Sequence, residues 1–160
     1  MRVGQGVDAH RLVAGRPLRL GGVEIPHERG LEGHSDGDVL LHAVASALLG
    51  AIGAGDLGTH FPSSDARWRG ADSGVLLEAV VALLRERGFA IGNLDATVIA
   101  QAPRLAPFRE AMRDALAKRL GVEPGRVNVK ITSTDALGAI GRGEGIAAQA
   151  VALVEERAGA

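Results

Sequence analysis

The chain has 160 residues, of which 46% are hydrophobic and 23% charged, and its formal net charge is −1. This length and composition predict one globular domain over 1–160, and the near-neutral charge argues against nucleic acid or an anionic membrane as a partner. Cysteine is absent, which excludes disulfides and thiolate metal ligands. No signal peptide or membrane-spanning segment is predicted, so we expect a cytoplasmic protein.

The first half of the chain predicts strands followed by one long helix. Residues 1–10 are expected to form a strand, and residues 17–26 a small hairpin with a two-residue turn at Gly21-Gly22. A loop rich in glycine and charged residues is expected from Glu28 to Asp38. It leads into a predicted helix over 38–52, whose start carries a capping-box-like pattern, Ser35-x-x-Asp38.

The second half predicts helices and strands that alternate. Helices are expected over 72–87 and 107–120, and strands over 94–101 and 126–133. Residues 145–156 fit either state, and we favour a strand that pairs with the 126–133 segment in one sheet. The predicted fold class is therefore α/β (α+β), a single domain with a mixed β-sheet and helices packed on one face. The uncovered face favours homo-oligomerisation.

The most informative residues for function are Asp8, His10 and His42. Asp8 and His10 are two positions apart, so an extended strand presents both side chains on one face. His42 lies in the apolar run of the 38–52 helix, on a narrow polar stripe with Asp38 and Ser46. A hydrogen-bonded core histidine explains His42 equally well by itself. The three residues together, however, predict a His/His/carboxylate metal site of the catalytic zinc type.

The segment from Glu32 to Asp38, directly before this helix, offers a second kind of site. A helix N-terminus attracts phosphate, and His34 and Ser35 add side-chain donors to it. The alternative is an acidic turn in which Ser35 and Asp36 cap the helix. The residues alone favour this alternative.

Gly53, Gly55 and Gly58 match the dinucleotide-binding pattern G-x-G-x-x-G, but they follow a predicted helix rather than a strand. We therefore interpret them as a loop that ends the helix and exposes Asp56 and the turn from Phe61 to Asp65. Asp56 is then either a ligand for a substrate hydroxyl or an ordinary turn residue.

Two later loops follow predicted strands. The loop from Ala100 to Ala106 contains small residues that let a flat ligand approach the backbone closely. The loop from Thr132 to Asp135 combines hydroxyls that suit phosphate oxygens with a carboxylate that suits magnesium. An ordinary strand-end loop explains either segment alone. The segment Gly141–Gly145 is either an anion clamp or a flexible loop.

Taken in order, these segments resemble the 2-C-methyl-D-erythritol 2,4-cyclodiphosphate synthases over essentially the whole chain. The matching motifs are Gly6-Val-Asp8-Ala-His10, Gly33-His34-Ser35-Asp36-Gly37-Asp38 with His42, Gly55-Asp56-Leu-Gly58, Phe61-Pro62, Ala100-Gln-Ala-Pro103 and Gly141-Arg-Gly-Glu-Gly145. The resemblance implies a homotrimer with active sites between subunits. It also implies a phosphorus–oxygen lyase of non-mevalonate isoprenoid biosynthesis, which cyclises 4-diphosphocytidyl-2-C-methyl-D-erythritol 2-phosphate and releases CMP.

The resemblance also implies roles for the matching residues. The three metal-site residues named above would hold Zn²⁺, and Asp135 would hold Mg²⁺ or Mn²⁺. His34 and Ser133 would stabilise the transition state while the substrate's own 2-phosphate attacks the β-phosphorus. The loops 100–106 and 132–135 would come from the neighbouring chain. The implied substrate-binding residues are Asp8, His10, His34, Ser35, Asp56, Gly58, Phe61, Ser64, Asp65, Ala100, Pro103, Arg104, Leu105, Ala106, Thr132, Ser133, Thr134, Asp135, Ala139 and Arg142.

The chain departs from the family pattern at several of these positions. Family members often carry threonine at Ser133, glutamate at Asp135 and Lys-Met-Leu at Arg104-Leu105-Ala106. Arg142 would line a cavity on the trimer axis that can hold an isoprenoid diphosphate, and Ala139, often phenylalanine, puts that ligand in question. Two other functions stay open, a zinc-dependent nucleotide diphosphate hydrolase and a non-catalytic trimer that binds metal and nucleotide.

Overall fold

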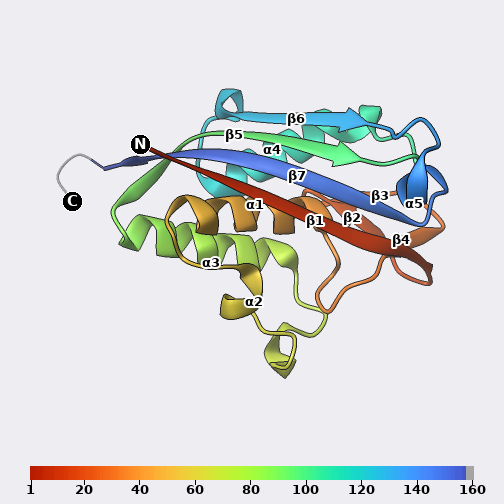
Figure 1. Ribbon diagram of the computed structural model, residues 1–160, viewed down its shortest axis with the longest axis horizontal. Helices are drawn as coiled ribbons and strands as arrows, with labels where there is room; N and C mark the ends of the chain where they lie inside the picture. Colours follow the sequence, from red (N-terminus) through yellow and green to blue (C-terminus); the bar gives the residue numbers. More distant parts are fainter. Residues whose placement is uncertain (158–160) are drawn as a thin grey trace.

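Strands and helices follow one another largely as expected in a computed structural model that describes residues 1–157 (Figure 1). The strands are β1 (Arg2–Ala14), β2 (Leu18–Leu20), β3 (Val23–Ile25), β4 (Arg29–Leu31), β5 (Phe89–Ile99), β6 (Val127–Thr132) and β7 (Gly145–Glu156). The helices are α1 (Val39–Ala51), α2 (Leu57–His60), α3 (Ser73–Glu86), α4 (Arg109–Leu120) and α5 (Gly138–Gly141). The last three residues of the predicted 1–160 domain lie outside the described part.

The main sheet has the strand order β4-β1-β7-β5-β6, and β2 and β3 form a separate hairpin. β5 and β6 run parallel while the other neighbours are antiparallel, so the predicted mixed sheet is confirmed. The strand preferred for 145–156 is also confirmed, as β7. Its expected pairing with the 126–133 strand is wrong, because β5 lies between β7 and β6.

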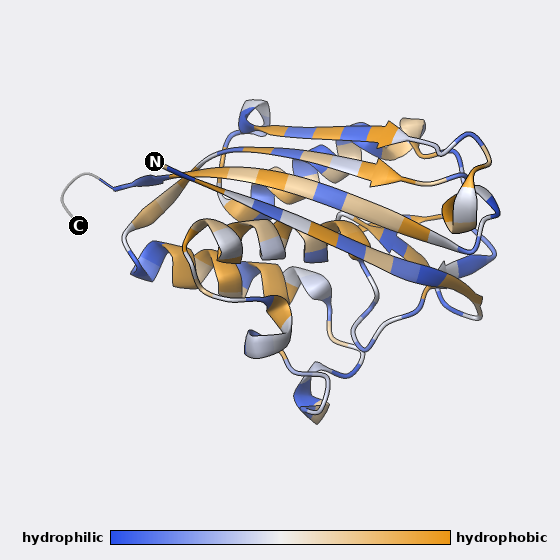
Figure 2. Cartoon of the chain, in the orientation of Figure 1, coloured by the Kyte–Doolittle hydropathy of each residue, from blue (hydrophilic) through white to orange (hydrophobic). Residues whose placement is uncertain are grey.

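One face of the sheet is covered by α1, α3 and α4 (Figure 1). Figure 2 shows hydrophobic and hydrophilic positions alternating along the strands, as expected when only one face is buried. On β7, for example, Ala148, Ala150 and Ala152 are buried, while Gln149 and Val151 are exposed. In the described chain no helix lies over this second face, which leaves a surface of strand side chains.

None of the helices within residues 1–157 combines the length and the apolar character needed to cross a membrane.

The strand β1 and the helix α1 approach each other closely because Gly4 and Gly6 lack side chains. A Cβ atom added at Gly6 would lie 2.0 Å from the carbonyl oxygen of Ala43, and one added at Gly4 would lie 1.9 Å from that of Ala47. Only glycine fits at both positions. The contact sets α1 directly against the strand that carries two of the predicted metal ligands.

The carboxylate of Asp38 joins the hairpin to the start of α1. It accepts hydrogen bonds from the backbone N–H groups of Gly21, Gly22 and Leu41 at 2.9, 2.7 and 3.1 Å. Burial raises the pKa of this carboxyl, and the three N–H donors oppose that shift. The N-cap of the helix is therefore Asp38 itself, and the capping box that starts at Ser35 is wrong.

Two strand predictions also differ from the structure. β4 forms inside the segment that was expected to be a loop, because Arg29–Leu31 pairs with the end of β1. β5 begins at Phe89 rather than at 94 and continues past an irregularity between Ile91 and Asn93. In both cases pairing with a strand distant in sequence extends the sheet.

Candidate active site and metal centre

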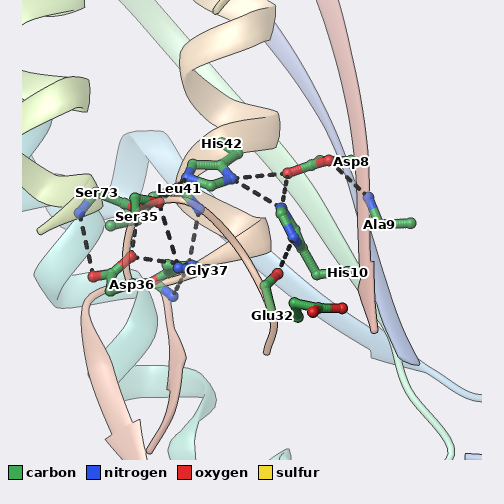
Figure 3. A network of polar contacts seen from close by, with 12 residues as sticks. Asp8, Ala9, His10, Glu32, Ser35, Asp36, Gly37, Leu41, His42 and Ser73 are labelled. Atoms are coloured by element: carbon green, nitrogen blue, oxygen red, sulfur yellow. Dashed lines mark hydrogen bonds and ion pairs between the residues drawn. The ribbon is translucent and has the colours of Figure 1, made fainter. Parts of the chain in front are cut away.

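The three predicted metal ligands meet at one point, as Figure 3 shows. The Oδ2 atom of Asp8 lies 2.8 Å from Nε2 of His10 and 2.9 Å from Nδ1 of His42, and the two nitrogens are 3.2 Å apart. β1 supplies Asp8 and His10, while α1 supplies His42. We call these residues the Asp/His/His trio.

The spacing of these donor atoms fits a single metal ion. A tetrahedral zinc ion with bonds of about 2.0–2.1 Å holds its ligand atoms roughly 3.3 Å apart. The three distances in the trio lie slightly below that value. Within residues 1–157, no other group of three histidine or acidic side chains is close enough to share an ion. Two imidazoles and one carboxylate also leave a fourth position for a further ligand.

The same contacts shift the proton affinities of the strand residues. Burial raises the pKa of the Asp8 carboxyl, but the neighbouring imidazoles of His10 and His42 outweigh burial and hold that pKa well below its usual range. The Asp8 carboxylate raises the pKa of His10, and burial opposes this effect. The trio thus contains a carboxylate that stays ionised, which is the form that binds a cation.

Each imidazole of the trio uses its second nitrogen to contact the surrounding protein. His10 Nδ1 contacts the carbonyl oxygen of Glu32, and His42 Nε2 lies 2.9 Å from Ser73 Oγ and 3.1 Å from Ser35 Oγ (Figure 3). A carbonyl oxygen can only accept, so His10 donates from Nδ1. Contacts of this kind fix the orientation of a ligating ring.

A cavity of about 360 Å³ opens beside the trio. The rings of Phe61 and Trp68 form part of its apolar side and meet edge to face, with centroids 5.0 Å apart. The other lining residues are Val7, Asp8, His10, His34, Ser35, His42, Ser46, Asp56, Leu57, Gly58, Ser63 and Leu76. A cavity that is polar at the trio and apolar opposite suits a small ligand with charged and hydrocarbon parts.

The loop before α1 is held in place by Arg16. Its guanidinium donates to the carbonyl oxygens of Gly33 at 3.0 Å and Ser35 at 2.7 Å, on either side of His34. His34 lines the cavity, and its Nε2 lies 3.4 Å from the carbonyl oxygen of Asp65. The N-cap of α1 is Asp38, so the favoured alternative, a turn in which Ser35 and Asp36 cap this helix, assigns the cap to the wrong residues.

The glycine-rich segment ends α1 and leads into the short helix α2, which confirms the predicted loop at the end of the helix. Asp56 caps α2 by accepting from the N–H and the hydroxyl of Thr59 at 2.8 and 2.9 Å, and these bonds lower its pKa. Asp56, Gly58 and Phe61 line the cavity, whereas Ser64 and Asp65 do not.

The remaining predicted site residues do not line the cavity of their own chain. They lie in the loops that follow β5 and β6 and around α5, at the end of the sheet to which the β5 and β6 arrows point in Figure 1. There the hydroxyl of Ser133 donates to Asp135 Oδ1 at 3.1 Å. Asp135 and Ala136 adopt positive φ angles of 51° and 65°, a conformation uncommon outside glycine and enriched at functional sites. Within one chain, Ser133 and Asp135 therefore do not line the cavity beside the trio.

Sequence reasoning missed Ser73, Trp68 and Leu76 as parts of the site. Ser73 stands at the start of α3, directly after its N-cap Asp72. In the sequence, a serine at this position suggests only a role in starting the helix. Only its burial in the folded structure, 1% exposed, sets it apart from an ordinary cap neighbour, and the sequence does not show that burial.

Comparison with known proteins identifies relatives along nearly the whole chain. The model of the YgbB family matches residues 1–155. The 2-C-methyl-D-erythritol 2,4-cyclodiphosphate synthase of Geobacter sulfurreducens is 59% identical over 157 residues, which cover 98% of this chain and 100% of that protein.

Two solved structures share the fold. The bifunctional IspDF of Campylobacter jejuni superposes with a TM-score of 0.94 at 42% identity, over 97% of this chain and 42% of that longer one. A CDP complex of IspF from Plasmodium falciparum superposes with a TM-score of 0.86 at 31% identity, over 98% of this chain and 96% of that one.

Proposed function

The chain belongs to the YgbB family, and from this premise we propose that it acts as a 2-C-methyl-D-erythritol 2,4-cyclodiphosphate synthase. The family resemblance drawn from the sequence motifs is thereby confirmed. In the proposed reaction, 4-diphosphocytidyl-2-C-methyl-D-erythritol 2-phosphate is converted to the cyclic diphosphate and CMP. The observation that carries the proposal is the meeting of the Asp/His/His trio at the wall of a ligand-sized cavity.

The trio is the proposed site of Zn²⁺, because two imidazoles and a carboxylate form a ligand set of catalytic zinc sites. When bound, zinc supplies a Lewis acid that polarises a phosphoryl oxygen and a template that orients the substrate. The second divalent metal, Mg²⁺ or Mn²⁺, is assigned to Asp135, whose carboxylate is exposed in the loop after β6.

The chain's own residues bind and orient the substrate, since its 2-phosphate is the nucleophile and no protein nucleophile is required. We assign His34 to donate a hydrogen bond to the phosphate charge that develops, because it lies on the cavity wall in a loop fixed by Arg16. Asp56 binds a hydroxyl of the erythritol part. Phe61 and Trp68 contact its hydrocarbon part and keep water away.

The cytidine end of the substrate is assigned to a neighbouring subunit of a homotrimer. The loops 100–106 and 132–135 do not line the cavity of their own chain, and in one subunit they are left without a ligand-binding role. The uncovered sheet face exposes Val3 by 65%, Val7 by 62% and Val151 by 38%, which favours burial against another copy.

Two further parts of the proposal concern the trimer axis and the cell. An isoprenoid diphosphate is assigned to the axis near Arg142, where it would compete with Glu144, which lies 2.6 Å from the Arg142 guanidinium. Ala139 offers little side-chain surface to such a ligand. A cytoplasmic location and a single domain over 1–160 belong to the same proposal.

Phosphorus NMR tests the proposal against its two rivals. The protein is incubated with the cytidylylated substrate, Zn²⁺ and Mg²⁺. CMP together with a cyclic diphosphate supports the synthase, whereas CMP with a linear bisphosphate indicates a nucleotide diphosphate hydrolase. Metal and CMP binding without any CMP release would leave only the non-catalytic trimer.

His42→Ala should lose zinc and activity while it stays folded, and stoichiometric zinc in that variant would remove His42 from the ligand set.

A further inference from the structure

We propose that Asp36 and Ser73 are positioning residues that keep the proton of His42 on Nε2 and so reserve Nδ1 for the metal. The three residues form a chain of contacts behind the trio (Figure 3). We call it the His42–Ser73–Asp36 relay. The inference rests on the metal proposed for the trio, because it explains how one of its ligands is prepared.

The direction of the relay follows from the contacts of Asp36. Its carboxylate meets only donors, namely the hydroxyl of Ser73, the N–H of Ser73 at 3.2 Å and the N–H of Asp38 at 3.2 Å. The Asp36 oxygens accept from all of these groups, so the Ser73 hydroxyl donates its single proton to Asp36. Ser73 Oγ can then only accept from His42 Nε2, which lies 2.9 Å away.

Burial leaves few alternatives to this direction of hydrogen bonding, because the Ser73 and Ser35 hydroxyls have little access to water. Ser73 is 1% exposed and Ser35 is 6% exposed, so both must use protein partners. Ser35 Oγ lies 3.1 Å from His42 Nε2 and from Ser73 Oγ, and it accepts from the Gly37 N–H at 3.4 Å. Since Ser73 gives its own proton to Asp36, Ser35 can donate to Ser73 Oγ and then accept from His42 Nε2 as a second acceptor, which strengthens the preference for that nitrogen.

The relay matters because Asp8 competes for the same proton. Asp8 Oδ2 lies 2.9 Å from His42 Nδ1, so it would accept a hydrogen bond from a proton placed there. A proton on Nδ1 would occupy the lone pair through which this nitrogen binds a metal. The relay offers a buried acceptor on the opposite side of the ring and draws the proton to Nε2. Two carboxylates thus compete across one imidazole, and the arrangement that leaves Nδ1 free is favoured by Ser73, Ser35 and Asp36 together.

Two variants and one control test the relay. Ser73→Ala removes the main acceptor, and Asp36→Asn removes the charge that orients it, so each should weaken zinc binding roughly 10–100-fold. In nitrogen-15 NMR of the metal-free protein, each should also shift the His42 proton from Nε2 towards Nδ1. Asp72→Ala is the matched control, because Asp72 caps the same helix through the Gly74 N–H at 2.7 Å without contacting the relay. It should lower thermal stability and leave zinc affinity and the His42 signals unchanged.

The outcomes separate the relay from the proposed reaction. Wild-type zinc affinity and an unchanged Nε2 proton in both variants would overturn the inference, as would an equal loss of affinity in Asp72→Ala. A wild-type protein whose His42 carries no proton on Nε2 would overturn it without any variant, even where a variant fails to fold. The NMR measurement needs no substrate. If the wild type forms no cyclic product but the His42 signals respond as expected, the synthase proposal fails and the relay stands.

Discussion

Replacing Gly6 by alanine should force β1 and α1 apart and thereby separate the ligands of the metal site. The new Cβ atom would lie 2.0 Å from the carbonyl oxygen of Ala43, 2.7 Å from the amide nitrogen of Ala47 and 2.9 Å from Ser46 Cβ. The two nearest atoms belong to the backbone of the helix, which cannot turn away as a side chain can. The helix itself must therefore move relative to the strand.

The size of this movement can be worked out from the same distances. Ordinary van der Waals contact of a Cβ begins near 3.4 Å, so roughly 1.4 Å must be gained at the Ala43 oxygen. His42 precedes Ala43 on the helix, whereas the other two ligands lie on the strand. A displacement of about 1 Å is far beyond the tolerance of roughly 0.2 Å in metal–ligand distances. We expect a loss of about 1–3 kcal/mol in the free energy of unfolding and of roughly 100-fold or more in zinc affinity.

Zinc competition with a chromophoric chelator and urea unfolding measure both quantities. Gly50→Ala is the control, because Gly50 lies on α1 near the same strand but an added Cβ there would meet its nearest atoms at 3.7 and 4.0 Å. Alanine is favoured over glycine in a helix by about 0.5–1 kcal/mol, so this variant should be more stable and bind zinc normally. A Gly6→Ala protein with wild-type stability and zinc affinity would refute the argument that the glycine contact positions His42.

Three further outcomes are expected. Asp38→Ala should lower the free energy of unfolding by about 3–5 kcal/mol in urea, because three backbone N–H groups lose their buried acceptor; a change under about 1 kcal/mol would contradict this. Arg16→Ala should reduce turnover without weakening zinc binding, since the Arg16 hydrogen bonds fix the carbonyls beside His34 and its positive charge does not attract a cation, and an unchanged kcat would count against that role. In the metal-free protein, Asp8 raises the pKa of His10, so the folded state binds the imidazole proton more tightly than the unfolded chain. This stabilisation is fully present below about pH 6.5 and is lost as the pH rises through the raised pKa. The difference in free energy of unfolding between the wild type and His10→Gln should accordingly become smaller at higher pH. A difference that does not change with pH would contradict the raised pKa of His10.

The long elements of the fold were predictable because each shows a regular pattern within its own residues. α1 and α3 bury one face or nearly all of their surface, and apolar periodicity records that burial. The residues of β7 fit either a helix or a strand by themselves, and its pairing with β1 and β5 decides the state. The wrong predictions concern segments that become strands only by pairing with another strand. β4 has three residues with a central Gly30 and becomes a strand only through β1. The start of β5 at Phe89 likewise depends on pairing with Glu156.

The residues of the candidate site likewise fall into two groups, those that a local pattern predicts and those that contacts between distant segments bring to the site. The orientation of Asp8 and His10 follows from strand geometry, and His42 is conspicuous as a polar residue in an apolar helix. Ser73 gave no such signal, since its contact with His42 spans 31 positions and depends on how α3 packs against α1. Trp68 reaches the cavity from a single turn of 3-10 helix, Ala66–Trp68, which is too short to show a periodic pattern.

The place of β1 in the sheet has a consequence for the order in which the protein can be made. β1 is inserted between β4 and β7, and its register with β7 runs from Arg2 opposite Val154 to Arg11 opposite Gly145. A ribosome releases β1 long before it synthesises β7, so this ladder cannot close during most of translation. Pairing over so long a sequence separation slows folding and leaves strand edges open to aggregation. The β1–α1 contact, in contrast, lies within the first 51 residues. The part of the molecule that gathers the metal ligands is thus the part that can assemble first on the nascent chain.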